Sequence, residues 1–589
     1  MATAPQAPSS THSPPQSTPA IPQAPPVTPV RKCGAELLCD VLAEQGVETA
    51  FGYPGGAILP TFDALYTKPL KFYLTRCEQG AGHMADGYSR ATGKVGTTIV
   101  TSGPGATNLT TALGTAYMDS IPMVAITGQV ATAAIGNDAF QEADVVGVTR
   151  PVTKHNVLVK RVEDLQRVVR EAYYIARTGR PGPVLVDVPK DVQVGLGEVS
   201  ADAGVDLPGY RPRATGNPRQ IRLAAEAINA AERPVLYVGG GVISSNGAEE
   251  LRQIARKGNI PVTTTLLGMG AIDEVADDRL ALHMLGMHGS AYANYAVQSS
   301  DLLIAVGARF DDRVTGNLET FAPYAKIIHI DVDPSSISKN VDVDIPVVGD
   351  AKVVLAEMLP LIEHRERAAW FGQIATWKQQ YPFSYKQQED REILPQYVIE
   401  QISRITDSSA IITTGVGQHQ MWSAQFYRWR WPRQMITSGG LGTMGYGFPA
   451  AVGAAVGRPD RPVIDIDGDG SFLMTCNELA TVAEYRIPVK VVILNNDFQG
   501  MVRQWQELFY GKRYMATVMT NPSFARVAEA FGCTGIDVRD PKHVPDAIRQ
   551  MLGTPGPVVM DVHVAPEENV YPMVAVGKSL HEMNMGGMA

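Results

Sequence analysis

The sequence predicts an α/β protein built from three doubly wound domains, each with a parallel sheet. The chain has 589 residues, which is too long for one domain, because domains usually contain roughly 100 to 200 residues. Hydrophobic residues make up 45% and charged residues 19%, a balance typical of a folded globular chain and not of a disordered, collagen-like or coiled-coil one. The third observation is a pattern of strand, glycine cluster, helix and second strand that recurs along the chain.

The recurring pattern predicts βαβ units. The glycine-ended strands lie at 96–105, 233–241 and 461–470, and each is followed, after a helix-length gap, by Ile-Pro and a second apolar strand. A buried strand, a glycine turn, a helix of three or four turns and another buried strand form a right-handed crossover between parallel strands. The alternative is chance, since Ile-Pro pairs also occur elsewhere. In the second copy, Asn246 and Glu249 resemble a capping box at the start of the helix.

The repeat also predicts domain limits. We expect domains at 31–195, 215–365 and 395–565, with 196–217 as a linker and 366–394 as a connecting segment. In open α/β sheets, ligands bind at the carboxyl ends of the strands, where glycine turns let backbone amides approach phosphate groups. Three such sheets therefore favour nucleotide-like cofactors.

Residues 1–30 are expected to be a disordered Pro/Ala/Ser-rich tail. They contain nine prolines and no Asp, Glu, Lys or Arg, so they have too little apolar surface to form a core. They lack the basic start and apolar stretch of a secretory signal and the arginines of a transit peptide. No stretch of the chain approaches the roughly 20 apolar residues of a membrane span.

The net charge and the cysteine content restrict the expected kinds of partner and the expected cell compartment. The net charge is −9 and no long basic run is present, so neither nucleic acid nor an anionic membrane is an expected partner. The five cysteines never have CxxC spacing, which argues against a disulfide framework or a structural zinc site. A cytoplasmic location is the simplest expectation.

The third glycine-ended strand carries a candidate metal and phosphate site. Asp469 lies between two glycines at the end of that strand, and Asn496 ends the next strand. Mg²⁺ prefers oxygen ligands, often one or two side chains together with phosphate oxygens. The amides of Gly470 and Ser471 open the following helix and are suited to bind a phosphate. An Asp turn and an Asn cap are the structural alternative, which the pairing of the two strand ends disfavours.

This segment resembles the diphosphate-binding motif of thiamine-diphosphate enzymes. The resemblance implies that Asp469, Asn496 and the carbonyl of Phe498 ligate Mg²⁺. It also implies that Gln418 and His419 contact the diphosphate and that Met444, surrounded by glycines, supports the bent cofactor.

Glu78 is the acid that such an enzyme requires in its first domain. It lies at the start of a helix rich in small and apolar residues, where a structural ion pair is the ordinary alternative. The resemblance makes Glu78 the partner of the cofactor's aminopyrimidine ring, in a proton relay that activates the thiazolium carbon. Because the family places its cofactor between subunits, a homodimer is the minimum unit and a homotetramer is common.

Further segments narrow the resemblance to the acetohydroxyacid synthase (acetolactate synthase) catalytic subunits. These segments are FGYPGGAILP, EQGAGHMADGY, IGNDAFQEADVVGVTRPVTKHN, GRPGPVLVDVPKDV, LGMHG, VGARFDDRVTGN, GMVRQWQELFY and YPMVAVG. The family decarboxylates pyruvate on thiamine diphosphate and condenses the hydroxyethyl intermediate with pyruvate or 2-ketobutyrate. The products, 2-acetolactate and 2-aceto-2-hydroxybutyrate, belong to the first common step of branched-chain amino acid biosynthesis. A separate small regulatory subunit is a further partner that the resemblance implies.

Several residues are predicted to handle the ketoacid substrates. A planar guanidinium binds a carboxylate bidentately, so Arg313 is the candidate for the second ketoacid; an ion pair with Asp311 or Asp312 is its alternative. Trp505 offers a rigid apolar wall for the extra methyl group of 2-ketobutyrate, worth roughly 1 to 3 kcal/mol, although a lone Trp is more often part of a core. The resemblance adds Phe140, Gln141, Lys190 and Met501 as substrate-site residues, and Gly56 as a close approach to the cofactor.

The middle domain resembles the flavin-binding domain of the same family, and FAD is expected to have a structural role because the condensation transfers no net electrons. The matching positions are Arg180, Gly239, Gly240, Thr265, Leu266, Met287, Gly307, Arg309, Asp311, Val314, Asp331 and Asp350.

The resemblance also places residues 566–589 as a tail over the active site. One departure is Cys77, where the family usually has His before the Glu.

Three rival functions remain, of which a non-catalytic assembly protein is the weakest. A flavin-containing pyruvate oxidase or carboligase would use the same cofactors with different chemistry, and Arg313 together with Trp505 disfavours it. A flavoprotein dehydrogenase would leave Glu78 and Asp469 without a role.

Overall fold

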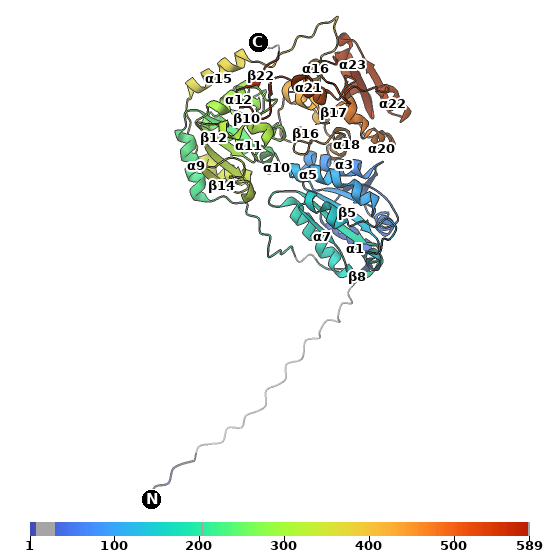
Figure 1. The fold of residues 1–589 in the computed structure, drawn as a ribbon. Coiled ribbons are helices and arrows are strands. Elements are labelled where there is room, and N and C mark those ends of the chain that lie inside the picture. The colour runs from blue at the N-terminus through green and yellow to red at the C-terminus, as the bar shows by residue number, and fades with distance from the viewer. Residues whose placement is uncertain (7–29, 202–203, 587–589) are drawn as a thin grey trace.

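The computed structural model describes residues 1–6, 30–201 and 204–586. Most of the predicted tail at 1–30 therefore lies outside the described residues. The described chain forms three six-stranded sheets in which every strand pairing is parallel, plus two small antiparallel pairs. The predicted fold class is confirmed. Figure 1 shows the three units grouped around a common centre, the middle unit on the left and the other two on the right.

The first unit has the strand order β3-β2-β4-β5-β7-β6. Its strands are β2 (Thr49–Tyr53), β3 (Lys71–Leu74), β4 (Gly96–Val100), β5 (Met123–Gln129), β6 (His155–Leu158) and β7 (Pro183–Pro189). Its helices are α1 (Gly34–Glu44), α2 (Leu59–Leu65), α3 (Glu78–Thr92), α4 (Pro104–Asn108), α5 (Thr110–Asp119), α6 (Val145–Thr149), α7 (Val162–Arg177) and α8 (Lys190–Val194).

The last unit repeats this order of strands as β16-β15-β17-β18-β20-β19. Its strands are β15 (Ile411–Thr414), β16 (Met435–Thr437), β17 (Val463–Gly468), β18 (Lys490–Asn495), β19 (Thr534–Val538) and β20 (Val558–His563). Its helices are α16 (Pro395–Ile405), α17 (Gln418–Phe426), α18 (Gly447–Gly457), α19 (Asp469–Leu473), α20 (Leu479–Tyr485), α21 (Gly500–Phe509), α22 (Phe524–Ala530) and α23 (Val544–Gly553).

The middle unit has a different order, β11-β10-β9-β12-β13-β14, which is the doubly wound order of dinucleotide-binding proteins. Its strands are β9 (Pro234–Val238), β10 (Val262–Thr264), β11 (Ala281–Met284), β12 (Leu302–Val306), β13 (Lys326–Asp331) and β14 (Ile345–Val348). Its helices are α9 (Pro218–Ala230), α10 (Gly240–Ser244), α11 (Ala248–Gly258), α12 (Ala291–Ser299), α13 (Asp312–Thr315), α14 (Ala351–Met358) and α15 (Ala368–Gln380).

The predicted repeat is present in all three units, with one difference. Strand β4 pairs with β5, β9 with β10 and β17 with β18, each in parallel register. The crossover, expected as one helix, is broken in each copy into two α-helices, and in the third copy a short 3-10 helix lies between them. In the second copy the predicted capping box is wrong. Asn246 has a positive φ of 56° and its side chain accepts from Arg433, so α11 begins two residues later without a side-chain cap.

The segments between the units are more ordered than their composition predicts. The expected linker starts with β8 (Leu196–Glu198), which pairs with β1 (Arg31–Cys33). The polar segment at 366–394 contains α15, which buries Trp370 and Ile374 against the middle unit. After residue 565 the chain returns to the middle unit as β21 (Met573–Val574) and β22 (Met583–Asn584).

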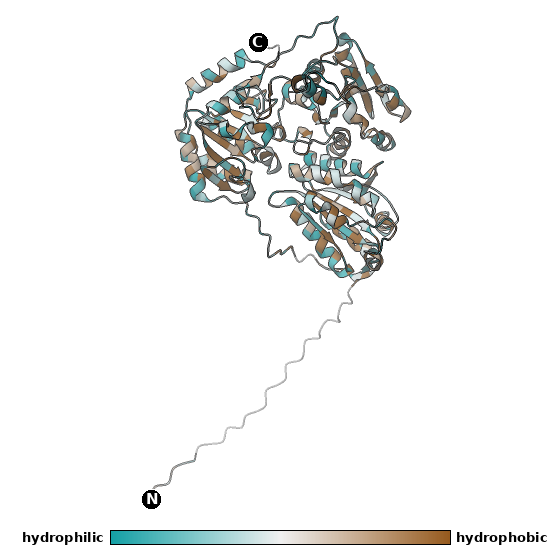
Figure 2. Cartoon of the chain, viewed as in Figure 1, coloured by the Kyte–Doolittle hydropathy of each residue, from teal (hydrophilic) through white to brown (hydrophobic). Residues whose placement is uncertain are grey.

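Figure 2 shows hydrophobic strands inside each unit and polar residues on the outer helices. In the part of the chain that the structure describes, no helix combines the length and hydropathy that a membrane crossing requires.

Helices α3 and α18 pack closely together where the first and last units meet. A Cβ atom on Gly87 of α3 would lie 2.1 Å from the carbonyl oxygen of Ala450, and one on Gly453 of α18 would lie 1.8 Å from that of Met84. Both glycines are therefore required, since a side chain at either position would collide with backbone. Most residues of both helices are buried, as expected for helices that are covered on every side.

Buried charge reinforces the same interface. Arg90 of α3 donates to Asp86 (2.6 Å), to Asp119 at the end of α5 (2.8 Å) and to the carbonyl of Thr437 at the end of β16 (2.9 Å). Asp119 in turn accepts from the amides of Gly439 and Gly440, at 3.0 and 2.7 Å. The loop after β16 is thus held by the first unit.

We expect Gly453→Ala to destabilise the protein, because the added methyl group meets the Met84 carbonyl and the two helices must separate. Overpacking of this kind typically costs about 1 to 3 kcal/mol. The midpoint of urea unfolding, followed by far-UV circular dichroism, measures the effect. Gly372→Ala is the matched control, since a Cβ there has nothing within 4 Å and alanine favours a helix. An equal loss in both variants would contradict the packing argument.

Candidate functional site

The ends of β15, β17 and β18 surround a small hollow in the last unit. Its volume is about 60 Å³. All residues predicted for the metal and diphosphate line it, namely Gln418, His419, Met444, Asp469, Gly470, Ser471, Asn496 and Phe498. The order β16-β15-β17 makes the edge between β15 and β17 a topological switch point, where open α/β sheets bind ligands.

Asp469 is the central acid of this hollow. It is 2% exposed; one carboxylate oxygen accepts from the Gly470 amide (3.0 Å) and the other from Asn521 (2.7 Å). Burial raises the pKa of Asp469 to about 6, while the hydrogen bond from Asn521 lowers it. A buried carboxylate beside an asparagine oxygen and a backbone carbonyl offers the all-oxygen ligands that suit Mg²⁺. The residues present therefore fit the predicted metal.

His419 and Gln418 connect the hollow to the surrounding structure. The His419 ring lies 3.4 Å from the buried carboxylate of Asp467, and burial lowers the pKa of the histidine to about 3, so the ring is neutral. Gln418 donates to Gln504 (2.9 Å) and to the carbonyl of Glu568 (3.0 Å). The chain that follows the last sheet therefore passes directly beside the hollow.

Asn521 is a residue that the sequence did not reveal. Its side-chain amide lies within hydrogen-bonding distance of Asp469, of Asn495 (3.1 Å) and of Asp497 (3.0 Å). It lies 52 positions after Asp469 in a segment without a motif, so only the fold brings it to the acid. In a metal site, a residue that donates a hydrogen bond to a ligand in this way orients that ligand.

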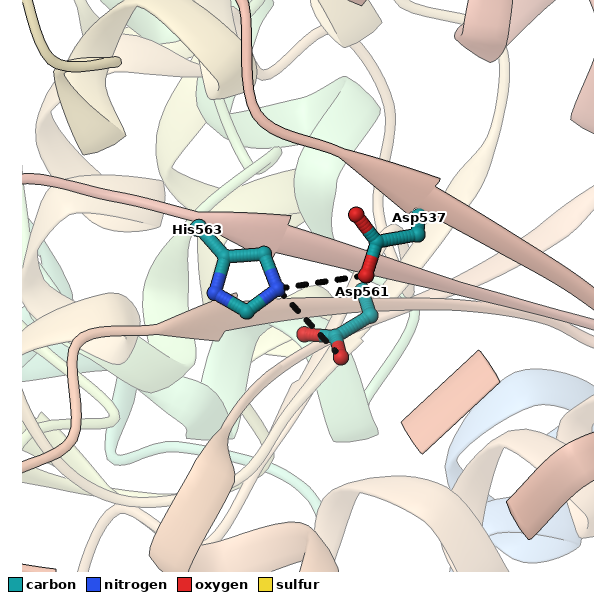
Figure 3. Close-up of side chains that lie close together, drawn as sticks. All are labelled: Asp537, Asp561 and His563. Atoms are coloured by element: carbon teal, nitrogen blue, oxygen red, sulfur yellow. Dashed lines mark hydrogen bonds and ion pairs between the residues drawn. The ribbon is translucent and has the colours of Figure 1, made fainter. Parts of the chain in front are cut away.

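A second acidic cluster lies on the adjacent strands β19 and β20 of the same sheet (Figure 3). His563 lies 3.4 Å from Asp537 and 3.7 Å from Asp561. Both Asp561 oxygens already accept protein hydrogens, from Asn495 and from the Phe524 amide, and Arg539 pairs with Asp537 at 2.8 Å. We therefore assign this cluster to the support of Asn495 and not to a metal.

The middle unit borders a much larger cavity of about 1350 Å³. Every residue predicted for FAD lines it: Arg180, Gly239, Gly240, Thr265, Leu266, Met287, Gly307, Arg309, Asp311, Val314, Asp331 and Asp350. All of them except Arg180 lie at or after the carboxyl end of a strand of the middle sheet, whose switch point is between β9 and β12. A Cβ on Gly239 would lie 2.1 Å from the Gly307 carbonyl, so the turns require glycine. The size and the glycine-lined turns fit a dinucleotide.

Arg180 reaches this cavity from the first unit. Its guanidinium donates to Ser120 (2.8 Å) and to Asp333 of the middle unit (3.3 Å). The cavity is therefore a junction of all three units, because Gly439 and Met444 of the last unit also line it.

The candidate substrate residues Arg313, Met501 and Trp505 line the same large cavity. The Arg313 side chain is 60% exposed and lies 3.8 Å from Asp312, and Asp311 pairs with Arg309 instead. The predicted ion-pair alternative is thus weak, and the guanidinium remains accessible to a ligand. Trp505 is half-buried and packs edge-on against Phe509, so it is a wall residue and not part of a core. Met444 and Met501 border both cavities, which makes the two sites adjoining.

The candidate residues of the first unit form a separate group. Gly56, Glu78, Phe140, Gln141 and Lys190 lie after carboxyl ends of the first sheet, and none of them lines either cavity. Phe140 is 89% exposed, Gln141 has a positive φ of 60°, and a Cβ on Gly56 would meet open space. Glu78 accepts from Asn108 at 2.9 Å. The candidate residues around Glu78 and those around Asp469 therefore form two separate groups, which we call half-sites.

Comparison with known protein families agrees with the division of the chain into three units. Residues 32–148 match the family described as thiamine pyrophosphate enzyme, N-terminal TPP binding domain; residues 221–358 match the central domain; and residues 415–562 match the C-terminal TPP binding domain.

Relatives with similar sequences span nearly the whole chain. An acetolactate synthase of Mycobacterium bovis is 50% identical over 93% of this chain and 91% of its own length. An acetolactate synthase large subunit of Parasynechococcus marenigrum is 50% identical over 93% of this chain and 90% of its own. The mitochondrial acetolactate synthase catalytic subunit of Saccharomyces cerevisiae is 49% identical over 93% and 83%. The chain therefore belongs to the thiamine-pyrophosphate-dependent enzymes, in the family of the acetolactate synthase catalytic subunits.

Proposed function

We propose that this acetolactate synthase condenses pyruvate with a second pyruvate or with 2-ketobutyrate, using thiamine diphosphate, Mg²⁺ and FAD. The observation that carries the proposal is the adjoining pair of cavities, in which an oxygen-rich hollow around Asp469 opens beside Arg313 and Trp505. In this proposal the hollow would hold a metal-bound diphosphate beside an exposed cation and an apolar wall, which are the groups that a ketoacid needs.

The chain's own residues have distinct tasks in this proposal. Asp469, Asn496 and the Phe498 carbonyl would hold Mg²⁺, and the amides of Gly470 and Ser471 would bind the diphosphate at the start of a helix. Bound thiamine diphosphate supplies the carbon nucleophile with which the first ketoacid is decarboxylated.

Glu78 would hold and move a proton at the aminopyrimidine ring, a role that a positioned carboxylate can perform. Arg313 would bind the carboxylate of the second ketoacid bidentately. Trp505 would pack against its alkyl group and favour 2-ketobutyrate by roughly 1 to 3 kcal/mol per methylene.

FAD would occupy the large cavity against the middle unit. Its role there is structural in this proposal, since joining two ketoacids with loss of carbon dioxide transfers no net electrons. The segment after residue 565 would cover the site, because it contacts Gln418 through Glu568 and Met287 through the Val574 amide.

We propose that the functional unit is a homodimer or a homotetramer. Glu78 and its neighbours lie away from the cavity that contains Asp469, so a complete site requires the first unit of another copy. Relatives named large subunit imply a small companion, and we propose a separate regulatory subunit for this chain as well. A cytoplasmic location fits the five free cysteines.

The purified protein should form acetolactate from pyruvate when thiamine diphosphate, Mg²⁺ and FAD are present. Acid decarboxylation of the product to acetoin, followed by a colorimetric assay, measures it. Oxygen consumption with acetate or acetyl phosphate, and no acetoin, would instead support the pyruvate oxidase alternative.

Glu78→Gln should lower turnover by roughly 10²- to 10⁴-fold, the usual contribution of a positioned acid or base, while FAD absorbance of the purified protein is retained. Glu226→Gln is the matched control, since Glu226 lies on the exposed face of α9. Turnover equal to that of the control would remove Glu78 from the mechanism.

Asn521→Ala should weaken Mg²⁺ binding by roughly 10- to 100-fold, because a support of a metal ligand is lost. The Mg²⁺ concentration that gives half-maximal activity measures the change. Asn229→Ala is the control, as Asn229 bonds the Leu361 carbonyl in the middle unit. If both variants require the same Mg²⁺ concentration, Asn521 does not support the metal site.

A further inference from the structure

Helix α3 lacks a cap of its own at the end where Glu78 lies. Its N-cap residue, Cys77, makes no side-chain capping bond, although the first amides of any helix have no partner within the helix. A side chain from the last unit instead binds the two amides directly before the helix. It belongs to Glu478, which ends the short 3-10 helix η7 (Cys476–Glu478).

The Glu478 carboxylate accepts the backbone amides that lead into α3. One oxygen accepts from Cys77 (2.9 Å) and Arg76 (3.0 Å), and the other lies 3.1 Å from the Arg76 amide. Thr481 donates to the carboxylate at 2.7 Å. Glu478 is 0% exposed, so these donors replace the water that a carboxylate normally needs.

The first turn of α3 is shaped for this approach. A Cβ on Gly80 would lie 2.4 Å from a Glu478 oxygen, so only glycine admits the carboxylate here. The next helix, α20, also binds this segment, because the Leu74 amide donates to the Tyr485 hydroxyl (3.0 Å). The last unit therefore binds the backbone amides of Leu74, Arg76 and Cys77.

We propose that Glu478 is a positioning residue that sets the place of Glu78. The inference rests on the proposed role of Glu78. The amides that Glu478 holds belong to the two residues directly before Glu78, and Asn108 holds the Glu78 side chain from the other side. Since Glu478 follows Asp469 by nine positions, a single short segment carries a metal-site ligand at one end and the support of Glu78 at the other.

This arrangement connects the two half-sites of one chain. In a dimer of the proposed kind, Asp469 and Glu78 of one chain serve different active sites. A displacement of the α19–η7 segment at one site would therefore be transmitted, through Glu478, to the acid of the other site.

Glu478→Gln tests the proposal in the holoenzyme and in the protein without cofactor. A glutamine keeps the shape but has one acceptor oxygen and no charge, so the hold on both amides weakens. Hydrogen–deuterium exchange of the peptide that contains residues 74–79 should accelerate about tenfold without any cofactor. In the holoenzyme, kcat and the exchange rate of the thiazolium C2 proton should fall about tenfold, with the KM for pyruvate changed less than twofold.

Glu484→Gln is the matched control. Glu484 lies on the same helix α20 and pairs with the Arg76 side chain at 2.5 Å, but it is 46% exposed, so both exchange rates and kcat should stay within twofold. Should Glu478→Gln fail to fold, Gly80→Ala provides a second variant, because the added methyl group displaces the carboxylate from the helix side and should give the same accelerated amide exchange.

A double-mutant cycle with Glu78→Gln separates positioning from general damage. If Glu478 acts through Glu78, the second substitution should lower kcat no further in the Glu78→Gln background. Equal fold losses in both backgrounds, or unchanged amide exchange in Glu478→Gln, would overturn the proposal. Full turnover of Glu78→Gln alone would instead contradict the proposed function.

Discussion

The close packing of α3 against α18 determines where every other functional element lies. Gly87 and Gly453 let the two helices approach until each glycine touches a backbone carbonyl of the other helix. Such contact leaves no room for sliding, because protein interiors are packed as densely as organic crystals. Since α3 begins with Glu78 and α18 follows the loop that carries Met444, the first and last units are joined as one body at their functional ends.

Polar groups fix both ends of α3 against the last unit. Just before its start, Glu478 accepts the amides of Arg76 and Cys77; near its end, Arg90 bonds Asp119 and the Thr437 carbonyl. Buried charges are costly unless they are fully paired, and removal of any one of them would leave its partners without compensation. These groups therefore select one arrangement of the two units, whereas apolar contact alone would tolerate several.

Sequence patterns predicted the residues whose chemistry is local. Gly239 and Gly307, or Asp469 and Asn496, follow strand ends. Because parallel sheets bring strand ends to one edge, a motif at each strand end was sufficient to predict that these residues lie close together. Asn521 and Glu478 could not be found in this way, because each acts on a segment far away in the chain and has no motif of its own. The split of the crossover helix at Asn246 was missed for a related reason: Arg433, in a distant unit, binds the side chain that was expected to cap the helix.

The strand orders bear on the proposal that a chain with two thiamine-type units works together with a second copy. The first and last sheets share one order, and each places its functional groups at its own switch point. In the described chain α3 is packed on α18, and the Arg90 and Glu478 networks bridge the two units. Loss of one partner of a buried charged group costs about 3 to 5 kcal/mol, a large part of the roughly 5 to 15 kcal/mol by which domains are usually stable. The first unit is therefore fixed where it lies, and in the proposed dimer the half of each site that contains Glu78 comes from another copy that presents the same first unit.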